Sequence, residues 1–287
     1  AQARAAEAAG YDRVMVMDHF YQLPGIGAPD EPMFECYSML AALAQHTETV
    51  RLSALVTGNT YRHPAVLAKM AATVDHISGG RVVLGLGAGW QENEHRAYGI
   101  TFDSLGGRMR RFDEACRVIK ALFSNDESSF QGDYYQLRDA PLVPKPVQQP
   151  LPLMIGGGGE KVTLRITAKY ADEWNVWGTV DILKHKMTVL DQHCDDVGRD
   201  PADIERSAVA MLVLSDDAAV LEKMRKREHA MPTNVGNVEE IRQIVGAYAE
   251  AGVDEFIVPA FNLGPRERAL DVLDQFIEEV VQSRGSE

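Results

Sequence analysis

Asp18 and His19 are the first residues whose types could do chemistry, because they directly follow an apolar segment. An imidazole takes up or releases a proton near neutral pH, and a neighbouring carboxylate can fix its tautomer. A lone histidine is more often structural than catalytic, so a position at the end of a predicted strand leaves both roles open for His19. His63, just before Pro64, is intermediate between a functional histidine and a surface one. The other histidines are expected at the surface: His46, His76, His95, His185, His193 and His229.

The strongest local motif is a run of four glycines: Gly156, Gly157, Gly158 and Gly159. They lie between an apolar segment and a helical pattern that starts near Glu160. Backbone N–H groups at a helix N-terminus hold a phosphate through oriented donors and the helix dipole. We expect a phosphate site here, with a flexible loop as the alternative. No Lys-Ser/Thr pair follows, so a nucleotide triphosphate is not indicated.

Two further segments, at residues 54–60 and 85–90, change abruptly from apolar to small or polar residues. Each pattern fits either the close approach of a planar ligand or a plain turn. The second segment, GLGAGW, is not a dinucleotide-binding fingerprint, because Trp90 stands where a third glycine is required. Asn93, Glu94 and His95 follow it at once.

The sequence lacks the motifs of nucleophilic catalysis and of metal sites. It contains no GxSxG elbow, no HExxH motif and no dense acidic cluster at strand ends, so nucleophilic catalysis and a metal site are not indicated. Cys36, Cys116 and Cys194 lie far apart without metal-ligand spacing, and we expect them to be free thiols.

The composition favours a soluble protein with a large core. The chain has 287 residues, 45% of them hydrophobic, and a formal net charge of -13 with acidic and basic residues mixed along it. This disfavours nucleic acid as a partner, and no apolar segment is long enough to cross a membrane. We expect a cytoplasmic location.

Apolar segments typical of buried parallel strands alternate with helical patterns along the chain. Seven strands are predicted, at residues 13–18, 50–58, 81–88, 153–156, 173–177, 207–214 and 256–259. Helices are predicted at residues 1–9 with Gly10 as C-cap, then at 35–46, 64–76, 108–123, 161–170, 239–251 and up to about 281. This alternation implies an α/β fold, a (β/α)8 TIM barrel in one domain over residues 1–287, with the first strand missing from this numbering. Long insertions are expected at about 124–151 and 180–205.

Three segments strongly resemble the luciferase-like superfamily, and within it the oxidoreductases that use the deazaflavin F420. They are TGNTYRHPAVLAKMAATVDHISGGRVVLGLGAGWQENEHRAYGI at 57–100, FQGDYYQLRDAPLVPKPVQQPLPLMIGGGGEKVTLRITAKYADEWN at 130–175 and VDEFIV at 253–258. The resemblance covers most of the chain and is weakest at 180–235. It implies hydride transfer between F420 and a small organic substrate.

The resemblance also implies roles for individual residues. Asp18 and His19 match an Asp-His pair at which the histidine faces the deazaflavin and donates or accepts a proton. Ala54 and Leu55 fall at a bulge with a non-prolyl cis peptide behind the middle ring of the cofactor. The other implied cofactor-binding residues are Thr57, Ala88, Asn93, Gly156, Gly157, Gly158 and Gly159.

One position departs from the family pattern. In the sugar-phosphate dehydrogenases of this superfamily a glutamate follows the strand-four glycines and serves as an acid, whereas Trp90 stands there in this chain. Glucose 6-phosphate is therefore not the expected substrate. Trp90, Trp174 and Trp177 are predicted to line an apolar substrate pocket, with core packing as the alternative for each.

Two other functions stay open at this point. The first is an FMN-dependent monooxygenase, which uses reduced flavin and dioxygen on the same barrel. The second is a cofactor-binding protein that has lost catalysis. The superfamily also implies a homodimer and an F420 or flavin reductase as partners.

Overall fold

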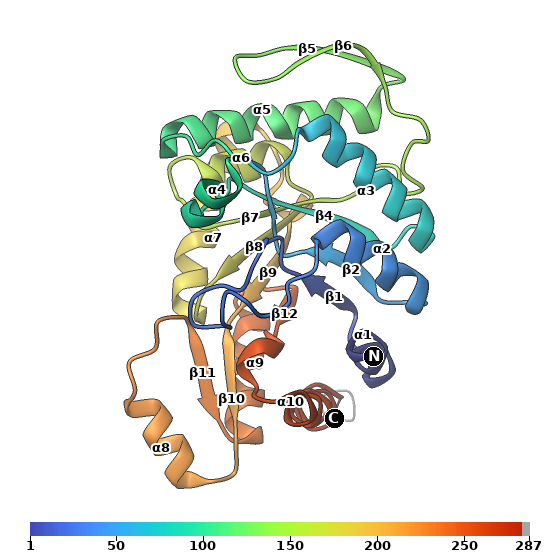
Figure 1. The fold of residues 1–287 in the computed structure, drawn as a ribbon. Helices are drawn as coiled ribbons and strands as arrows, with labels where there is room; N and C mark the ends of the chain where they lie inside the picture. The colour runs from blue at the N-terminus through green and yellow to red at the C-terminus, as the bar shows by residue number, and fades with distance from the viewer. Residues whose placement is uncertain (283–287) are drawn as a thin grey trace.

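The computed structural model describes residues 1–282, and their central feature is a curled parallel sheet (Figure 1). Its strands follow one another in chain order: β1 (Arg13–Val16), β2 (Arg51–Ala54), β4 (Val82–Gly87), β7 (Leu153–Gly156), β8 (Glu173–Trp177), β9 (Glu205–Val209) and β12 (Glu255–Ile257). A short strand, β3 (Thr57–Gly58), pairs with β4. Within the described residues, the edge strands β1 and β12 do not pair with each other, so the sheet forms a half-barrel. The predicted α/β alternation is confirmed.

Helices connect the strands, and most of them cover the outer face of the curled sheet (Figure 1). They are α1 (Gln2–Ala9), α2 (Cys36–His46), α3 (Pro64–Ser78), α4 (Glu92–Tyr98), α5 (Leu105–Ser124), α6 (Thr163–Tyr170), α7 (Val180–Val197), α8 (Ala218–Lys226), α9 (Val238–Glu250) and α10 (Arg266–Gln275), which continues as a π-helical turn, Phe276–Val281.

Local signals explain where several helices begin and end. Gly10 adopts the left-handed conformation, with φ of 97°, and ends α1 as predicted. The Glu35 carboxylate accepts hydrogen bonds from the backbone N–H groups of Tyr37 and Ser38 and caps α2. Pro64 occupies the first turn of α3, where its missing N–H costs nothing.

The main core lies between the sheet and helices α2, α3 and α5. Leu52, Leu84 and Ile155 from three neighbouring strands pack there with Leu67 and Phe112 from the helices, all almost completely buried. Burying each such side chain contributes about 1.5–3 kcal/mol. This packing fixes the directions in which the strands end, and therefore the positions of the residues that follow them.

The structure differs from the expectation at one of the two predicted insertions. Residues 180–205, predicted as an insertion, consist mainly of α7, the helix that connects β8 to β9. Its buried Leu183, Met187, Leu190 and Cys194 repeat at helical spacing and pack against the neighbouring elements. The insertion at 124–151 contains an antiparallel hairpin of β5 (Glu127–Gln131) and β6 (Gln136–Pro141), which projects beyond α5 (Figure 1).

The predicted strand at 207–214 is in fact two strands. β9 belongs to the curled sheet, whereas β10 (Met211–Leu214) leaves it and pairs in parallel with β11 (Thr233–Gly236). Helix α8 lies between them in the chain, so this β-α-β unit extends away from the sheet (Figure 1).

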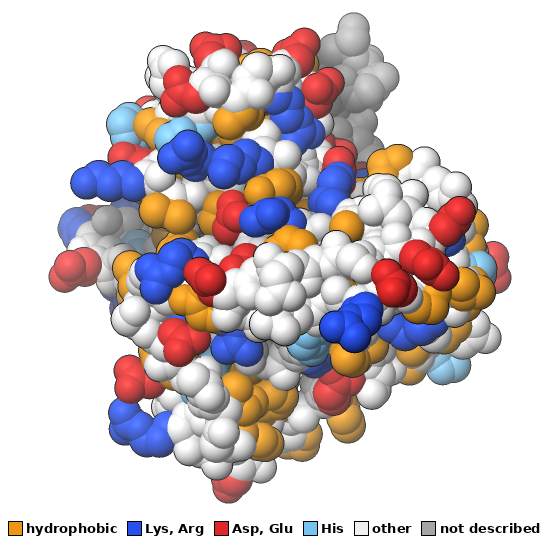
Figure 2. Space-filling model, turned by 90° about the horizontal axis from the view of Figure 1, so that it is seen from above, with side chains coloured by type: hydrophobic (Ala, Val, Ile, Leu, Met, Phe, Trp, Pro, Cys, Tyr) orange, Lys and Arg blue, Asp and Glu red, His pale blue; other side chains and the backbone are white. Residues whose placement is uncertain are grey.

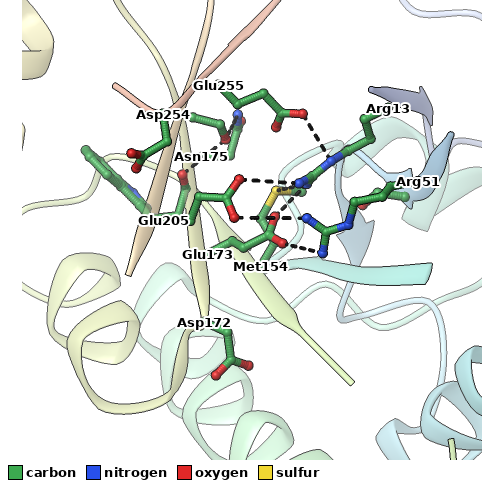
Figure 3. Close-up of polar contacts among 12 residues, drawn as sticks. Arg13, Arg51, Met154, Asp172, Glu173, Asn175, Glu205, Asp254 and Glu255 are labelled. Atoms are coloured by element: carbon green, nitrogen blue, oxygen red, sulfur yellow. Dashed lines mark hydrogen bonds and ion pairs between the residues drawn. The ribbon is translucent and has the colours of Figure 1, made fainter. Parts of the chain in front are cut away.

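A cluster of charged side chains joins the first residues of five strands (Figure 3). The Arg13 guanidinium lies 2.5 Å from a Glu173 carboxylate oxygen, 3.1 Å from one of Glu255 and 3.7 Å from one of Glu205. Arg51 lies 2.9 Å from the other oxygen of Glu173. Because β1 and β12 are the unpaired edges, Arg13 links the two ends of the half-barrel electrostatically.

The surface carries charges of both signs. On the face shown in Figure 2, Lys and Arg side chains are interspersed with Asp and Glu, with hydrophobic side chains scattered among them. Among residues 1–282, no helix is long and apolar enough to cross a membrane.

Candidate functional site

His19 lies in the loop that follows β1, three residues after Val16, and its ring is held by a carboxylate from α4. The His19 Nδ1 atom is 2.7 Å from Glu94 Oε2, and the His19 side chain is 12% exposed. The Trp90 indole meets the imidazole edge-on, with ring centroids 5.8 Å apart. A proton-transfer group is thus fixed at the carboxyl end of a strand while part of its surface remains open.

Within residues 1–282, the Asp18 carboxylate makes no hydrogen bond to His19, contrary to the expectation that it fixes the histidine tautomer. Its carboxylate accepts two hydrogen bonds from Arg62, at 2.7 and 2.9 Å, and one at 3.0 Å from the backbone N–H of Gly58. Burial lowers the pKa of Arg62, but the hydrogen bonds and the charge of Asp18 outweigh it and raise that pKa. Asp18 therefore holds the end of β3, and its carboxylate oxygens are already engaged.

Leu55 and Val56 form an irregular segment between β2 and β3, called the bulge below, which lies next to the Ala54–Leu55 position that the resemblance implies. The peptide bond between Leu55 and Val56 is cis. The Val56 side chain projects between two neighbouring strands, because a Cβ on Gly87 or on Gly156 would come within 2.7 Å of a Val56 methyl carbon. Glycines at those strand ends are therefore required by Val56, and the bulge lies beside the glycine run.

The residues predicted along the cofactor have different exposures. Ala54 and Thr57 are buried, and the Thr57 hydroxyl lies 2.8 Å from the Tyr37 hydroxyl. Ala88 is half-buried, whereas Asn93 is exposed and accepts a hydrogen bond from the backbone N–H of Glu94. Ala88 and Asn93 thus remain available to a ligand, while the Thr57 hydroxyl already has a partner.

The four glycines connect β7 to a turn before α6. The N–H of Gly157 donates to Asn175 O, so it continues the sheet, and none of the described hydrogen bonds uses the N–H of Gly158, Gly159 or Glu160 as donor. Helix α6 begins at Thr163, later than predicted, and has no side-chain cap. Free N–H groups before an uncapped helix N-terminus fit an anionic group.

A cation lies next to this loop, but it is already paired. Lys186 of α7 passes close to Gly158, since a Cβ there would be 3.6 Å from Lys186 Cε. Its ammonium group is 2.5 Å from a Glu160 carboxylate oxygen, and His185 is 3.2 Å from the same oxygen. The two side chains lower the pKa of Glu160, so an anion at the loop would have to compete with an ionised carboxylate.

The tryptophans predicted to line a pocket are placed in three different ways. Trp174 is completely buried in the core under α6 and α7, and its indole N–H donates to Gly157 O at 2.9 Å, so it shapes the glycine loop and is not a pocket wall. Trp177 is half-buried at the end of β8. Trp90 is 64% exposed, next to His19.

Aromatic side chains surround the His19 end of the site. The Phe20 ring stacks on Tyr98 with centroids 4.6 Å apart and lies equally close to Tyr61. Tyr98 also stacks on Tyr21. These contacts dock α4 against the loop that follows β1 and give the site an aromatic rim.

Sequence reasoning missed the roles of Glu94 and His95. Glu94 is completely buried and engages three donors. His95, expected at the surface, is also completely buried, with its ring nitrogens 2.8 Å from Gln91 O and 2.6 Å from Thr60 Oγ1. The only sequence signal was their place directly after the strand-four glycines. Within residues 1–282, no group of His, Cys, Asp and Glu side chains is arranged to hold a metal ion.

Comparison of the sequence with known proteins identifies relatives of this chain. A profile of the luciferase-like monooxygenase family matches residues 1–252. An F420-dependent glucose-6-phosphate dehydrogenase of Amycolatopsis mediterranei is 36% identical over 169 residues, which are 58% of this chain and 47% of that protein. An FMNH(2)-dependent dimethylsulfone monooxygenase of Pseudomonas putida is 31% identical over 170 residues, 59% of this chain and 46% of that one. The matched regions thus span about half the length of these curated relatives.

The fold has close counterparts among solved structures. An F420-dependent secondary alcohol dehydrogenase in complex with an F420-acetone adduct superimposes with a TM-score of 0.81 over 97% of this chain and 92% of that one. Its sequence is 24% identical, so this similarity shows a shared fold.

Proposed function

The chain belongs to the luciferase-like monooxygenase family, and from that premise we propose that it is an F420-dependent oxidoreductase. When bound, the deazaflavin supplies the hydride acceptor or donor, and His19 takes up or releases the accompanying proton. The observation that carries the proposal is that His19, the bulge at Val56 and the glycine loop follow β1, β2 and β7, and so lie at the carboxyl ends of strands in one parallel sheet. Sequence relatives that use F420 support it.

The residues of this chain fit such a cofactor. The bulge at Ala54, Leu55 and Val56 would back the ring system, with Thr57, Ala88 and Asn93 beside it. The free N–H groups at Gly158 and Gly159 and the uncapped start of α6 would receive the phosphate of the tail. Lys186 would complement that charge once it turns from Glu160. These residues would orient the bound cofactor, with aromatic side chains beside His19.

We propose that the substrate is a small neutral organic molecule and not glucose 6-phosphate. Trp90 occupies the position beside His19, and an indole offers apolar surface where a sugar phosphate needs polar partners. Arg62 is also tied to Asp18 and Glu35 and is not free to bind a phosphate. A ketone, imine, alcohol or activated alkene would each fit the proton chemistry of His19.

Turnover of a substrate panel in wild type and in His19→Ala tests this function. With F420, the wild type should interconvert at least one member of the panel. The variant should lose about 10²- to 10⁴-fold in kcat, the size of a general acid–base contribution, and should bind F420 with unchanged Kd. Full activity of the variant would refute the role of His19.

The second candidate is an FMN-dependent monooxygenase, favoured by the dimethylsulfone monooxygenase relative. It requires reduced FMN and consumes dioxygen in step with product formation. Oxygen consumption that depends on reduced FMN, with no turnover on F420, would establish this candidate instead.

We also propose a cytoplasmic homodimer, served by an F420 or flavin reductase. Support for a dimer comes from exposed Val66 and Ile77 on α3 and exposed Val143 and Val147 on the segment along it. That segment is held to α3 by Lys69, which donates to Val143 O. A mass measured in solution tests the dimer, and Val143→Glu should shift it toward the monomer.

A further inference from the structure

Glu94 forms the most completely buried ionisable contact of the site. Its side chain is completely buried, whereas Glu92 on the same helix is exposed. Oε2 lies 2.7 Å from His19 Nδ1 and accepts a hydrogen bond from the Tyr61 hydroxyl at 2.7 Å. Oε1 accepts from the backbone N–H of Phe20 at 2.5 Å. Both oxygens are thus fixed, and the carboxylate cannot rotate without losing a donor.

The protonation of this group follows from its surroundings. Burial alone would favour the neutral acid, but the hydrogen bonds from His19, Tyr61 and Phe20 outweigh it and lower the pKa of Glu94. An ionised carboxylate can only accept hydrogen bonds. The proton between Glu94 and His19 must therefore lie on Nδ1 of His19.

Nε2 is the ring nitrogen of His19 that remains able to exchange a proton with a substrate. No residue among 1–282 makes a hydrogen bond to His19 Nε2. The adjacent Trp90 indole contacts the imidazole in a T-shaped ring arrangement. We infer that Glu94 is the positioning residue of His19: it holds the Nδ1–H tautomer, so that Nε2 is the atom that exchanges a proton with the substrate.

The resulting step is balanced in atoms and charge. In the oxidative direction, the C–H bond of an alcohol would break with its electron pair, and bound F420 would supply the hydride acceptor. The hydroxyl proton bonds to Nε2 and forms an imidazolium ion beside the ionised Glu94. In the reductive direction the imidazolium returns that proton to the developing alkoxide. Buried negative charge next to Nδ1 stabilises the imidazolium in both directions.

An isosteric replacement exposes this role. In Glu94→Gln the amide has one acceptor and one donor end, whereas the site offers donors on both sides. The amide NH2 must face either Phe20 N–H or His19 Nδ1, and the negative charge is lost in either case. Glu92→Gln is the matched control, because Glu92 is exposed on the same helix and pairs with Arg96.

The first readout is the ¹⁵N NMR spectrum of the imidazole in the cofactor-free protein, assigned by its absence in His19→Ala. The wild type and Glu92→Gln should show a protonated Nδ1 and an unprotonated Nε2 for neutral His19. Glu94→Gln should show a mixture of tautomers or a protonated Nε2. A wild-type His19 that is protonated on Nε2 refutes the inference, and this measurement stands even where the variant folds poorly.

The second readout is turnover, and this arm alone rests on the proposed function. Glu94→Gln should lose about 10²-fold or more in kcat with little change in KM, whereas Tyr61→Phe, which keeps the carboxylate, should retain the wild-type tautomer. A Glu94→Gln variant with the wild-type tautomer and the turnover of Glu92→Gln overturns the inference. If the tautomer depends on Glu94 but His19→Ala turns over F420 normally, the proposed function fails and the positioning role stands.

Discussion

Replacing Arg13 by methionine should destabilise the half-barrel strongly. The Arg13 side chain is 4% exposed and forms ion pairs with Glu173, Glu205 and Glu255 (Figure 3). Methionine keeps most of the side-chain volume but leaves Glu173, which is itself 5% exposed, with Arg51 as its remaining cation. Removing one partner of a buried ion pair costs about 3–5 kcal/mol, because the other charge stays desolvated.

The loss in free energy of unfolding caused by Arg13→Met should depend on pH in a defined direction. Burial raises the pKa of Glu205 and Glu255, and the positive charge of Arg13 opposes that rise in both. A carboxyl group with a raised pKa in the folded state stabilises the fold at low pH, and this contribution is lost as the pH rises through the folded pKa. Without Arg13 the two pKa values rise further. The destabilisation should therefore be larger at pH 7.5 than at pH 5.

Urea unfolding of the wild type and of Arg13→Met, each at pH 5 and at pH 7.5, measures the difference in free energy of unfolding. Arg96→Met is the control, since Arg96 is 79% exposed and pairs with Glu92 one turn away, where such a pair is worth about 0.3–0.5 kcal/mol. An Arg13→Met variant that loses no more stability than Arg96→Met, or loses more at pH 5 than at pH 7.5, would refute the reasoning.

Three further changes test other parts of the structure. Gly85→Ala should lose about 3 kcal/mol in urea unfolding, because its Cβ would lie 2.0 Å from the backbone oxygen of Ala54; Gly106→Ala, with only ordinary contacts, should be neutral. Trp174→Phe should cost about 1–3 kcal/mol, since Gly157 O loses its indole donor, and should weaken F420 binding at the glycine loop; unchanged stability and Kd would contradict this. Backbone N–H groups of Thr49, Val50 and Glu48 lower the pKa of Glu7 to about 2, a contribution present above about pH 4.5 and lost as the pH falls toward 2. Glu7→Gln should therefore be less stable than wild type at pH 7 and nearly equal to it near pH 2, as measured by thermal unfolding.

Strand order and most helix positions could be predicted because they depend on local patterns. β7 and β8 were located at their observed bounds, since an apolar segment between turn residues is typical of a buried parallel strand. The break within residues 207–214 could not be found this way. Its cause is that β10 pairs with β11 beyond α8, a partner that no local pattern identifies.

The site was only partly predictable for the same reason. His19 could be identified because it directly follows a strand. Its true partner is separated from it by 75 residues and lies on another element, whereas adjacent Asp18 turned out to hold Arg62. Trp174 likewise carries no sequence signal that separates a pocket wall from a core side chain. Adjacency in the sequence therefore suggested the wrong carboxylate.

The most direct test of the central claim is an equilibrium titration of the purified protein with F420 and with FMN, each in oxidised and reduced form. We expect selective binding of F420, weakened by changes at the glycine loop and unaffected by His19→Ala. Selective binding of reduced FMN, with no measurable affinity for F420, would contradict the account and establish the chain as a flavin monooxygenase.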